Sequence, residues 1–489
     1  MRGVLKQITR RISKNFRLIS WAIVLAVTGA GIVGLAWWLT YDPTTRFLAS
    51  IPGMDGSPSR TEQSSRRIRI GEFFRLFESA AAKLPGSWPR FRGSRSDNIS
   101  KDEARLADSW APEGPEILWR VGLGEGHAAP AVLNGRVYVL DYDEQTNADA
   151  LRCFSLADGK ELWRRWYAVQ VKRNHGMSRT VPAVNDRYVV SIGPRCHAMC
   201  LDSSDGAFKW GIDLEREYGT QIPLWYTAQC PLLDDNTAVI APCGDQALMI
   251  GVDCESGQVL WQTPNPEGLQ MSHSSIMTMT LNDRRMYVYA GIGGVVGVSA
   301  EQADRGALLW QTDAWSPRVV APSPVILEDG RIFLTAGYGA GSMMIQVRER
   351  GGEYAVQPLY SYRPREGLAC EQQTPILYDG HLFGILPKDG GELRNQFVCY
   401  HPEGRIVWTS GPNNRYGLGP FMAADGKFFI LGEDGVLTMI RATTTGFEPL
   451  DRAKVLEGRD PWGPLALAGG RMLLRDSTEM VCIDLREEN

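Results

Sequence analysis

The sequence predicts an all-β protein, an eight-bladed β-propeller with four-stranded antiparallel blades, preceded by one N-terminal transmembrane helix. Three observations lead to this prediction. The 489 residues include 52 glycines, 28 prolines and 15 tryptophans, which indicates many tight turns between short strands. A Gly-x-x-x-Trp motif recurs along the chain, and strand pairs of one type precede it. One uncharged stretch long enough to cross a bilayer lies near the N-terminus.

The uncharged stretch runs from Leu18 to Thr40. A helix that rises about 1.5 Å per residue crosses a hydrocarbon core of about 30 Å over this length. The stretch is longer than the apolar region of a cleavable signal peptide, and Trp37, Trp38 and Tyr41 at its end suit a membrane interface. We therefore expect an uncleaved signal anchor at residues 18–40, and membrane contact through this segment.

The orientation of the anchor follows from the charges that flank it. All basic residues of the first 40 positions precede the anchor, and they are Arg2, Lys6, Arg10, Arg11, Lys14 and Arg17. The positive-inside rule makes residues 1–17 a cytoplasmic basic tail. We expect a single-pass protein of the inner (cytoplasmic) membrane whose remaining chain is periplasmic or otherwise extracytoplasmic. A small residue every fourth position from Ala22 to Gly34 permits a weak homodimer through the anchor, or reflects the usual composition of such spans.

Residues 41–87 predict a linker followed by a helix. The stretch to Ser65 is rich in proline, glycine and serine, as linkers are. From Ile70 to Leu84 apolar residues follow helical spacing, and Pro85 and Gly86 end the pattern. We expect an amphipathic helix that docks on the following domain or lies on the membrane surface.

The repeated motif defines the units of a domain at residues 88–489. Its tryptophans recur at intervals of about 50 residues or twice that, close to the period of propeller repeats; they are Trp163, Trp210, Trp261, Trp310 and Trp408. The double interval indicates that one unit has lost its tryptophan, and counting places Leu359 at that position. Pairs of β-branched and aromatic runs, joined by short polar turns, occur eight times between residues 117 and 485.

The two ends of the repeat region complement each other. The last unit supplies three strands, whereas Ile117–Val121 at the front has the composition of a fourth strand without a blade. Pairing them closes the ring and leaves no unpaired sheet edge. Four strands in about 46 residues also match the blade length of propellers.

These features resemble the PQQ-binding-like β-propeller repeat family. The resemblance rests on the sequence Trp88-Pro89-Arg90-Phe91-Arg92-Gly93, on the Asp-containing turns before each motif and on the number of units, and it covers residues 88–485. The family includes pyrroloquinoline-quinone (PQQ) alcohol dehydrogenases and the propeller lipoprotein of the outer-membrane barrel-assembly machinery. The resemblance implies the fold but not one function. The dehydrogenases carry a disulfide between neighbouring cysteines beside the cofactor, and this sequence has no Cys-Cys pair.

The chain has nine cysteines. Four share one position of the repeat, at Cys153, Cys200, Cys399 and Cys482. Gly251 and Gly297 take this position in other units, so we expect a cramped site and buried core thiols. Cys230 and Cys243 flank one hairpin and are either free or a disulfide. None of the spacings matches a structural zinc site, and we expect no metal.

Candidate ligand-binding residues lie in the segments that precede the first strand of each unit. These segments enter the ring from one face, so equivalent positions meet around the central channel, where propellers usually bind ligands. The candidates are His127, Arg179, His273, Glu371, Gln372, Arg415 and Tyr416. Cations, a carboxylate and an aromatic ring together suit a small anionic or quinone-like ligand. The alternative is a solvated rim that binds nothing.

Two functions remain after the other classes are excluded. The chain beyond the anchor is net acidic, which argues against nucleic-acid binding, and it lacks the GxSxG and HExxH motifs of hydrolases. We favour a binding or scaffold protein that uses the propeller face for envelope proteins and has no cofactor and no catalytic residue. The alternative is a PQQ-dependent quinoprotein oxidoreductase with PQQ and Ca²⁺ in the channel and Glu371 or Asp460 as ligand or base. Short blades with few insertions favour the first function.

Overall fold

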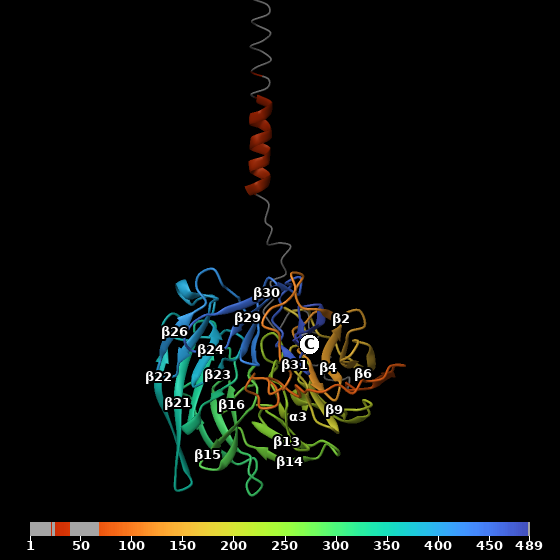
Figure 1. Cartoon of the computed structure of the whole chain (residues 1–489), viewed down its shortest axis with the longest axis vertical. Coiled ribbons are helices and arrows are strands. Elements are labelled where there is room, and N and C mark those ends of the chain that lie inside the picture. The colour runs from red at the N-terminus through yellow and green to blue at the C-terminus, as the bar shows by residue number, and fades with distance from the viewer. Residues whose placement is uncertain (1–20, 22–24, 40–67, 488–489) are drawn as a thin grey trace, which may run out of the picture. The chain divides into compact units, whose positions relative to one another are not determined.

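The computed structural model describes residues 21, 25–39 and 68–487, which belong to two units, Met1–Arg66 and Arg67–Asn489. In the first unit Trp21 and residues 25–39 are helical (Figure 1). Among the residues described, no helix reaches the length and hydropathy that a membrane crossing requires. The basic tail, parts of the predicted anchor and the linker up to residue 67 lie outside the described residues.

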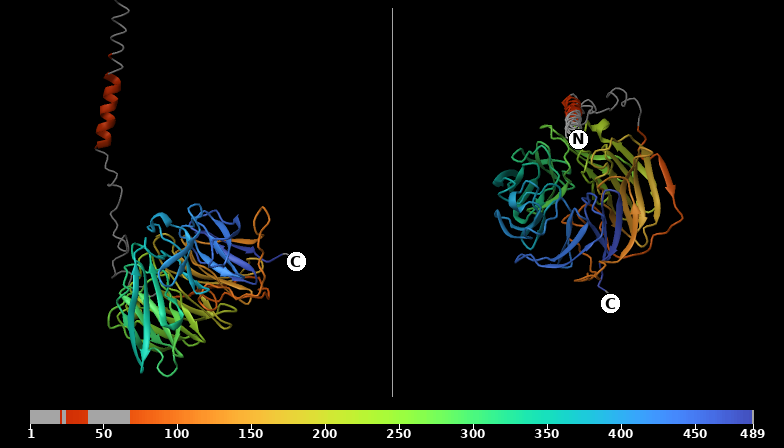
Figure 2. Two further views of the ribbon diagram at one scale, coloured as in Figure 1. Left: turned by 60° about the vertical axis from the view of Figure 1, so that its left-hand side comes forward. Right: turned by 90° about the horizontal axis from the view of Figure 1, so that it is seen from above.

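The second unit is a ring of eight antiparallel sheets, as the sequence predicts (Figure 2). The first strands of neighbouring blades contact one another, β3 with β7 and β31 for example, so they line the central axis. The hydrophobic core lies between blades, where one cluster joins Trp163 of blade 1 to Met199 of blade 2. This arrangement buries both faces of the middle strands of the blades, such as β8 and β12, which accounts for their strongly apolar sequences.

Blades 1 to 4 follow one another along the chain. Blade 1 contains β3 (Ala131–Leu133), β4 (Arg136–Asp143), β5 (Ala148–Ser155) and β6 (Glu161–Ala168). Blade 2 contains β7 (Ala183–Val184), β8 (Tyr188–Ile192), β9 (His197–Asp202) and β10 (Phe208–Asp213), and the short helix α3 (Leu214–Tyr218) follows it. Blade 3 contains β11 (Leu232–Asp234), β12 (Thr237–Ile240), β13 (Met249–Asp253) and β14 (Val259–Thr263). Blade 4 contains β15 (Met277–Leu281), β16 (Arg284–Gly291), β17 (Gly294–Ser299) and β18 (Leu308–Thr312).

Blades 5 to 8 complete the ring. Blade 5 contains β19 (Val325–Ile326), β20 (Arg331–Ala336), β21 (Gly341–Arg350) and β22 (Glu353–Tyr362), with the 3₁₀ turn η2 (Glu328–Gly330). Blade 6 contains β23 (Ile376–Tyr378), β24 (His381–Ile385), β25 (Phe397–His401) and β26 (Arg405–Thr409), with η3 (Gly391–Leu393). Blade 7 contains β27 (Phe421–Ala424), β28 (Lys427–Leu431), β29 (Val436–Arg441) and β30 (Pro449–Lys454). Blade 8 contains β31 (Ala466–Ala468), β32 (Arg471–Arg475), β33 (Glu479–Asp484) and β2 (Ile117–Gly122).

The ring closes as predicted, because β2 pairs with β33 and supplies the fourth strand of blade 8. The position assigned to the lost tryptophan of blade 5 is wrong by one residue. Gly251 pairs with Trp261 and the ladder skips Leu260, and in blade 5 Met344 pairs with Tyr360 while the ladder skips Leu359. Tyr360 therefore occupies the tryptophan position, and Leu359 points outward with 43% of its surface exposed.

The amphipathic helix predicted from Ile70 to Leu84 is wrong. This segment is extended, and its residues Phe73–Leu76 form β1, which pairs with β6 as a fifth strand of blade 1. Arg165 explains the preference, because its guanidinium covers the ring of Phe74 at 4.7 Å and donates to the carbonyl of Gly71 at 2.8 Å. Hydrogen bonds to the open edge of a sheet thus outweigh a helical spacing of apolar residues.

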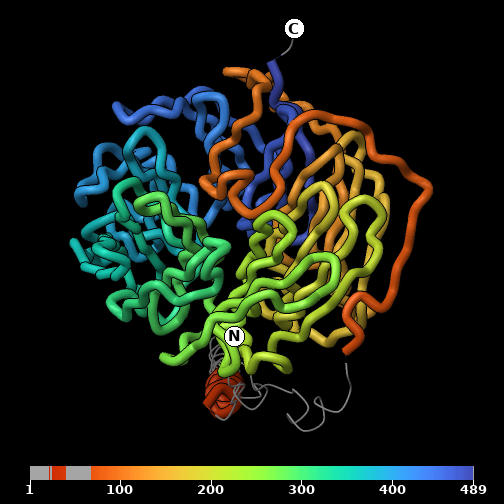
Figure 3. Tube along the Cα trace, turned by 90° about the horizontal axis from the view of Figure 1, so that it is seen from below, coloured from red at the N-terminus to blue at the C-terminus, as the bar shows by residue number. Residues whose placement is uncertain are grey.

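The segment from Trp88 to Ser100 lies across one end of the ring (Figure 3). Its hydrogen bonds reach the inner parts of five blades, at Val132, Val184, Leu233, Thr374 and Ala423. Arg92 anchors it, because its buried guanidinium donates to the carbonyls of Thr374 and Pro375 at 2.7 and 2.9 Å. The segment thereby covers this end of the channel and places Phe91 in the channel cavity.

The cysteines are all free and buried. Cys153 lies opposite Trp163 and Cys200 opposite Trp210 in their ladders, which is why the position accepts only a small residue. Burial raises the pKa of Cys399 to about 12, so the thiol stays protonated at neutral pH. Cys230 and Cys243 form no disulfide.

Candidate functional site

A cavity of about 120 Å³ lies in the central channel. Five of the predicted residues line it, and they are His127, Arg179, His273, Glu371 and Gln372. They come from the segments that precede β3, β7, β15 and β23, as the shared register of these segments predicts. Segments from four blades thus converge on one cavity, with Phe91 contributed by the covering segment.

Arg415 and Tyr416 do not reach this cavity, contrary to the predicted grouping. They line a separate groove together with Asp434 and Leu450 of blade 7. The guanidinium of Arg415 is held by the carbonyls of Glu392, Arg394 and Pro412. The Tyr416 ring packs into the core between blades 6 and 7, which leaves it 5% exposed. Hydrogen bonds to nearby carbonyls therefore hold Arg415 away from the channel, and packing in the adjacent core does the same for Tyr416.

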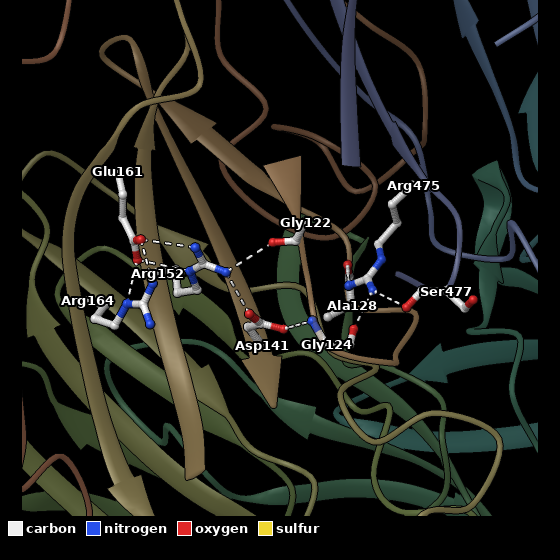
Figure 4. A network of polar contacts seen from close by, with 9 residues as sticks. All are labelled: Gly122, Gly124, Ala128, Asp141, Arg152, Glu161, Arg164, Arg475 and Ser477. Atoms are coloured by element: carbon white, nitrogen blue, oxygen red, sulfur yellow. Dashed lines mark hydrogen bonds and ion pairs between the residues drawn. The ribbon is translucent and has the colours of Figure 1, made fainter. Parts of the chain in front are cut away.

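The segment that carries His127 is clamped between blades 8 and 1 (Figure 4). Arg475 of β32 is buried and donates to the carbonyls of Gly124 and Ala128, both at 3.1 Å. Asp141 of β4 accepts from the Gly124 amide at 2.6 Å and is itself held by Arg152 at 2.8 Å. Burial lowers the pKa of Arg475 to about 10, so it remains a cation at neutral pH. This network fixes the backbone on both sides of His127.

His127 is held as a neutral hydrogen-bond acceptor. Its Nε2 donates to the carbonyl of His175 at 3.0 Å, so the proton of the neutral ring lies on Nε2 and Nδ1 carries a lone pair. Nδ1 is buried and has no hydrogen-bond partner among the residues described. Burial, and then the charge of Arg179, lowers the pKa of His127 to about 3. The ring lies 5.0 Å from that of Trp462, which also lines the cavity.

Arg179 is positioned by backbone carbonyls alone. Its Nε donates to Trp225 at 2.6 Å, and its Nη2 donates to the carbonyls of Asn174, His175 and Gly176 at 3.0, 2.7 and 3.2 Å. Nη1 takes part in none of these bonds. Burial lowers the pKa of Arg179 to about 10, which still leaves it charged at neutral pH. The same charge, after burial, lowers the pKa of His273 to about 4.

Aromatic rings form one wall of the cavity. Trp225 stacks with His273 at 6.1 Å and with Tyr338 at 5.6 Å. Trp225 and Tyr338 both have positive φ, at 65° and 56°, which costs about 1 kcal/mol or more for each residue. Strain of this kind is concentrated at functional sites. Sequence reasoning missed Tyr338, because it lies in the turn between β20 and β21; its only signal is an aromatic residue between two glycines.

Glu371 is a buried carboxylate with one oxygen in use. Its side chain is 2% exposed, and Oε1 lies 3.1 Å from Nζ of Lys388, which is 67% exposed. Oε2 is buried without a hydrogen-bond partner among the described residues. Lys388 also lies 5.5 Å from the centre of the Tyr338 ring. The ion pair thus links the buried carboxylate to the surface beside the aromatic wall.

The donor set does not fit PQQ with Ca²⁺. Within the described part of the chain, no three His, Cys, Asp or Glu side chains are grouped closely enough to hold a metal ion. Glu371 is the carboxylate of the cavity, and Lys388 already occupies one of its oxygens.

The fold and its channel cavity place the protein among the β-propellers of the PQQ-repeat class. The family described as outer membrane protein assembly factor BamB matches residues 147–410, more than half of the chain, and the chain belongs to this family. No curated protein matches the sequence.

Solved structures share the fold at low identity. A europium-containing methanol dehydrogenase is 12% identical, with a TM-score of 0.55 and coverage of 82% of this chain and 90% of that one. The quinohemoprotein alcohol dehydrogenase from Comamonas testosteroni is 11% identical, with a TM-score of 0.53 and coverage of 84% and 82%. BamB from Moraxella catarrhalis is 11% identical, with a TM-score of 0.49 and coverage of 76% and 98%. The likeness to the two dehydrogenases establishes the fold alone.

Proposed function

We propose that this protein is a membrane-anchored, extracytoplasmic propeller that acts as a binding or scaffold protein in the cell envelope. Its membership of the BamB family carries the proposal, because the description of that family names an assembly factor for outer membrane proteins. Envelope proteins are accordingly the proposed class of partner. Propellers present loops from many blades on one face, which gives a broad surface suited to such partners.

The proposed location rests on the sequence of the N-terminus. Leu18–Thr40 would hold the protein in the inner membrane, with residues 1–17 in the cytoplasm, because six basic residues and no acidic residue precede this stretch. The propeller would then act on the extracytoplasmic side.

The proposed partner face is the one that carries the cavity. Leu224 and Tyr338 are large apolar residues with 45% and 49% of their surface exposed, and Lys388 lies beside Tyr338. Exposed apolar groups rimmed by polar ones are typical of protein-binding surfaces. A photo-crosslinking amino acid at Leu224 should therefore capture envelope proteins in living cells. The same amino acid at Leu260, exposed on β14 at the outer edge of blade 3, is the matched control.

The competing function, a quinoprotein oxidoreductase, is supported by fold likeness alone. Adding PQQ and Ca²⁺ to the purified full-length protein and recording the absorption spectrum separates the two. The scaffold proposal predicts no protein-bound quinone and no PQQ-dependent dye reduction. Bound quinone together with dye reduction that Glu371→Ala abolishes would establish the enzyme instead. Absence of crosslinks from Leu224 to any envelope protein would contradict the scaffold proposal directly.

A further inference from the structure

The channel cavity contains three polar atoms that lack a partner in the described structure. Nη1 of Arg179 is a free donor, and Nδ1 of His127 and Oε2 of Glu371 are buried acceptors. His127 and Glu371 are 7% and 4% exposed, so both lie away from the outer surface of the propeller. A buried polar atom without a hydrogen bond costs about 1–3 kcal/mol, so the two buried acceptors, in one cavity lining with the half-buried Arg179 donor, indicate a ligand that satisfies them.

The charges of the cavity do not cancel. The Glu371 carboxylate is balanced by Lys388, whereas no described carboxylate forms an ion pair with Arg179. Arg475 is also clamped by carbonyls, but there all three guanidinium nitrogens donate, so that side chain is complete without a ligand. Arg179 keeps one nitrogen free and one positive charge unpaired. A monoanion that binds Nη1 would accept a hydrogen bond from this nitrogen and would also balance the positive charge of Arg179.

The remaining features define the rest of the ligand. The two unpartnered acceptors require a donor such as a hydroxyl group, because the depressed pKa of His127 keeps its Nδ1 unprotonated. Phe91, Trp225 and Trp462 supply an apolar and aromatic lining. A volume of about 120 Å³ corresponds to about four water molecules at about 30 Å³ each, which is enough for a carboxylate and a hydroxyl group. Tyr338 lines the cavity and is 49% exposed, so the cavity opens to the surface there and the apolar body can extend along this opening.

We propose that the cavity binds a small monocarboxylate that carries a hydroxyl group and an apolar body, such as an aromatic α-hydroxy acid. The carboxylate lies on Nη1 of Arg179, the hydroxyl donates to Glu371 or His127, and the apolar body packs against Trp225 and Phe91. Charge balance favours this class over a zwitterionic amino acid, because an added ammonium group would leave the Arg179 charge uncompensated. The inference goes beyond the envelope role and does not depend on the membrane anchor.

The test uses the full-length protein in detergent and follows tryptophan fluorescence, since Trp225 and Trp462 line the cavity. The probes are 3-phenyllactate, 3-phenylpropionate without the hydroxyl, 2-phenylethanol without the carboxylate, and phenylalanine. Saturable binding should be strongest for 3-phenyllactate, weaker for phenylpropionate and phenylalanine, and absent for phenylethanol. No saturable binding of phenyllactate at millimolar concentration, or equal or tighter binding of phenylethanol or phenylalanine, would overturn the proposal without affecting the scaffold function.

Variants add a second criterion. Arg179→Gln should weaken phenyllactate binding tenfold or more, because it removes a charged donor. Arg415→Gln is the matched control, since this guanidinium is also held by three carbonyls but lies outside the cavity. It should leave the affinity unchanged. Equal effects of the two substitutions would overturn the proposal, and the probe series on the unaltered protein decides the matter if Arg179→Gln fails to fold.

Discussion

Gly206, in the turn before the last strand of blade 2, lies directly against the indole of Trp163 in blade 1. A Cβ added to Gly206 would lie 2.8 Å from Cδ2 of that ring. Gly257 meets Trp210 and Gly159 meets Trp119 in the same way. The Gly-x-x-x-Trp motif is therefore an interblade contact, in which the glycine of each of these blades receives the tryptophan of the preceding blade around the ring.

This contact predicts that Gly206→Ala destabilises the propeller. Gly206 has a φ of 72°, so alanine adds both backbone strain and a clash with the ring. Gly426→Ala is the control, because Gly426 has a φ of 67° but nothing lies within 4 Å of its added Cβ. We expect Gly206→Ala to lose about 1–3 kcal/mol more than Gly426→Ala in urea unfolding, which is the usual cost of overpacking. Equal losses would mean that the interblade contact contributes nothing.

Ring closure by β2 predicts a difference between two truncations. Removing residues 1–115 and removing residues 1–123 both delete the covering segment, but only the second also deletes β2 and exposes the edge of β33. Both truncations also remove β1 and open the edge of β6, but the shorter protein has the additional open edge of β33 and should therefore aggregate more than the longer one. Light scattering at increasing protein concentration measures this. Identical scattering would contradict closure as the role of β2.

Asp149 predicts a pH-dependent stability. Burial raises its pKa to about 7, although the hydroxyl of Tyr167 donates to its Oδ2 at 2.6 Å. The folded state therefore holds a proton that the unfolded state releases near pH 4. This contribution to stability, on the order of 4 kcal/mol, is present at low pH and is lost as the pH rises from about 4 to about 7.

Asp149→Asn removes this titration, and the difference in unfolding free energy between mutant and wild type should change with pH only in this window. In Tyr167→Phe the loss of stability with rising pH should extend to higher pH than in the wild type. The Tyr167 hydrogen bond lowers the pKa of Asp149, so removing it raises that pKa further. Urea unfolding at several pH values measures both effects. A pH profile of Asp149→Asn parallel to that of the wild type would show that Asp149 titrates normally.

The buried thiols predict protection from chemical labelling. Cys153, Cys200, Cys399 and Cys482 all have no exposed surface, and burial raises the pKa of each. The reaction requires a thiolate that the reagent can reach, so an aromatic disulfide reagent should label these cysteines only after the protein unfolds. In denaturant all nine thiols should react. Fast labelling of these four cysteines under native conditions would contradict their burial inside the blades.

The ring was predictable from sequence because its period is visible in the residues that contact one another, as at Gly206 and Trp163. β1 was not predictable, because Phe73 and Phe74 satisfy helical spacing and only the open edge of β6 selects a strand. The tryptophan position of blade 5 shifted because a bulge skips Leu359. Tyr360 replaces the hydrogen bond that the tryptophan makes in other blades. Its hydroxyl donates to the carbonyl of Pro402, as Nε1 of Trp210 donates to the carbonyl of Cys254.

The cavity was predictable to the extent that its residues share one segment of the repeat. His127 and His273 follow this rule, whereas Arg415 has the right register but bonds to the carbonyls of Glu392 and Arg394 in the preceding blade. Tyr338 and Phe91 come from a hairpin turn and from the covering segment, where the repeat register gives no information. The repeat register therefore brings a residue near the channel, but the hydrogen-bond acceptors around its side chain decide whether that side chain faces the channel.

The most direct test of the proposed envelope function is to determine on which side of the membrane the propeller lies. A C-terminal fusion after Asn489 to alkaline phosphatase, which is active only after export, and a parallel fusion to a fluorescent protein that matures only in the cytoplasm report this side. The proposed topology predicts high phosphatase activity and no fluorescence, because the basic residues before Leu18 retain the N-terminus inside. Fluorescence without phosphatase activity would place the propeller in the cytoplasm and contradict the envelope function.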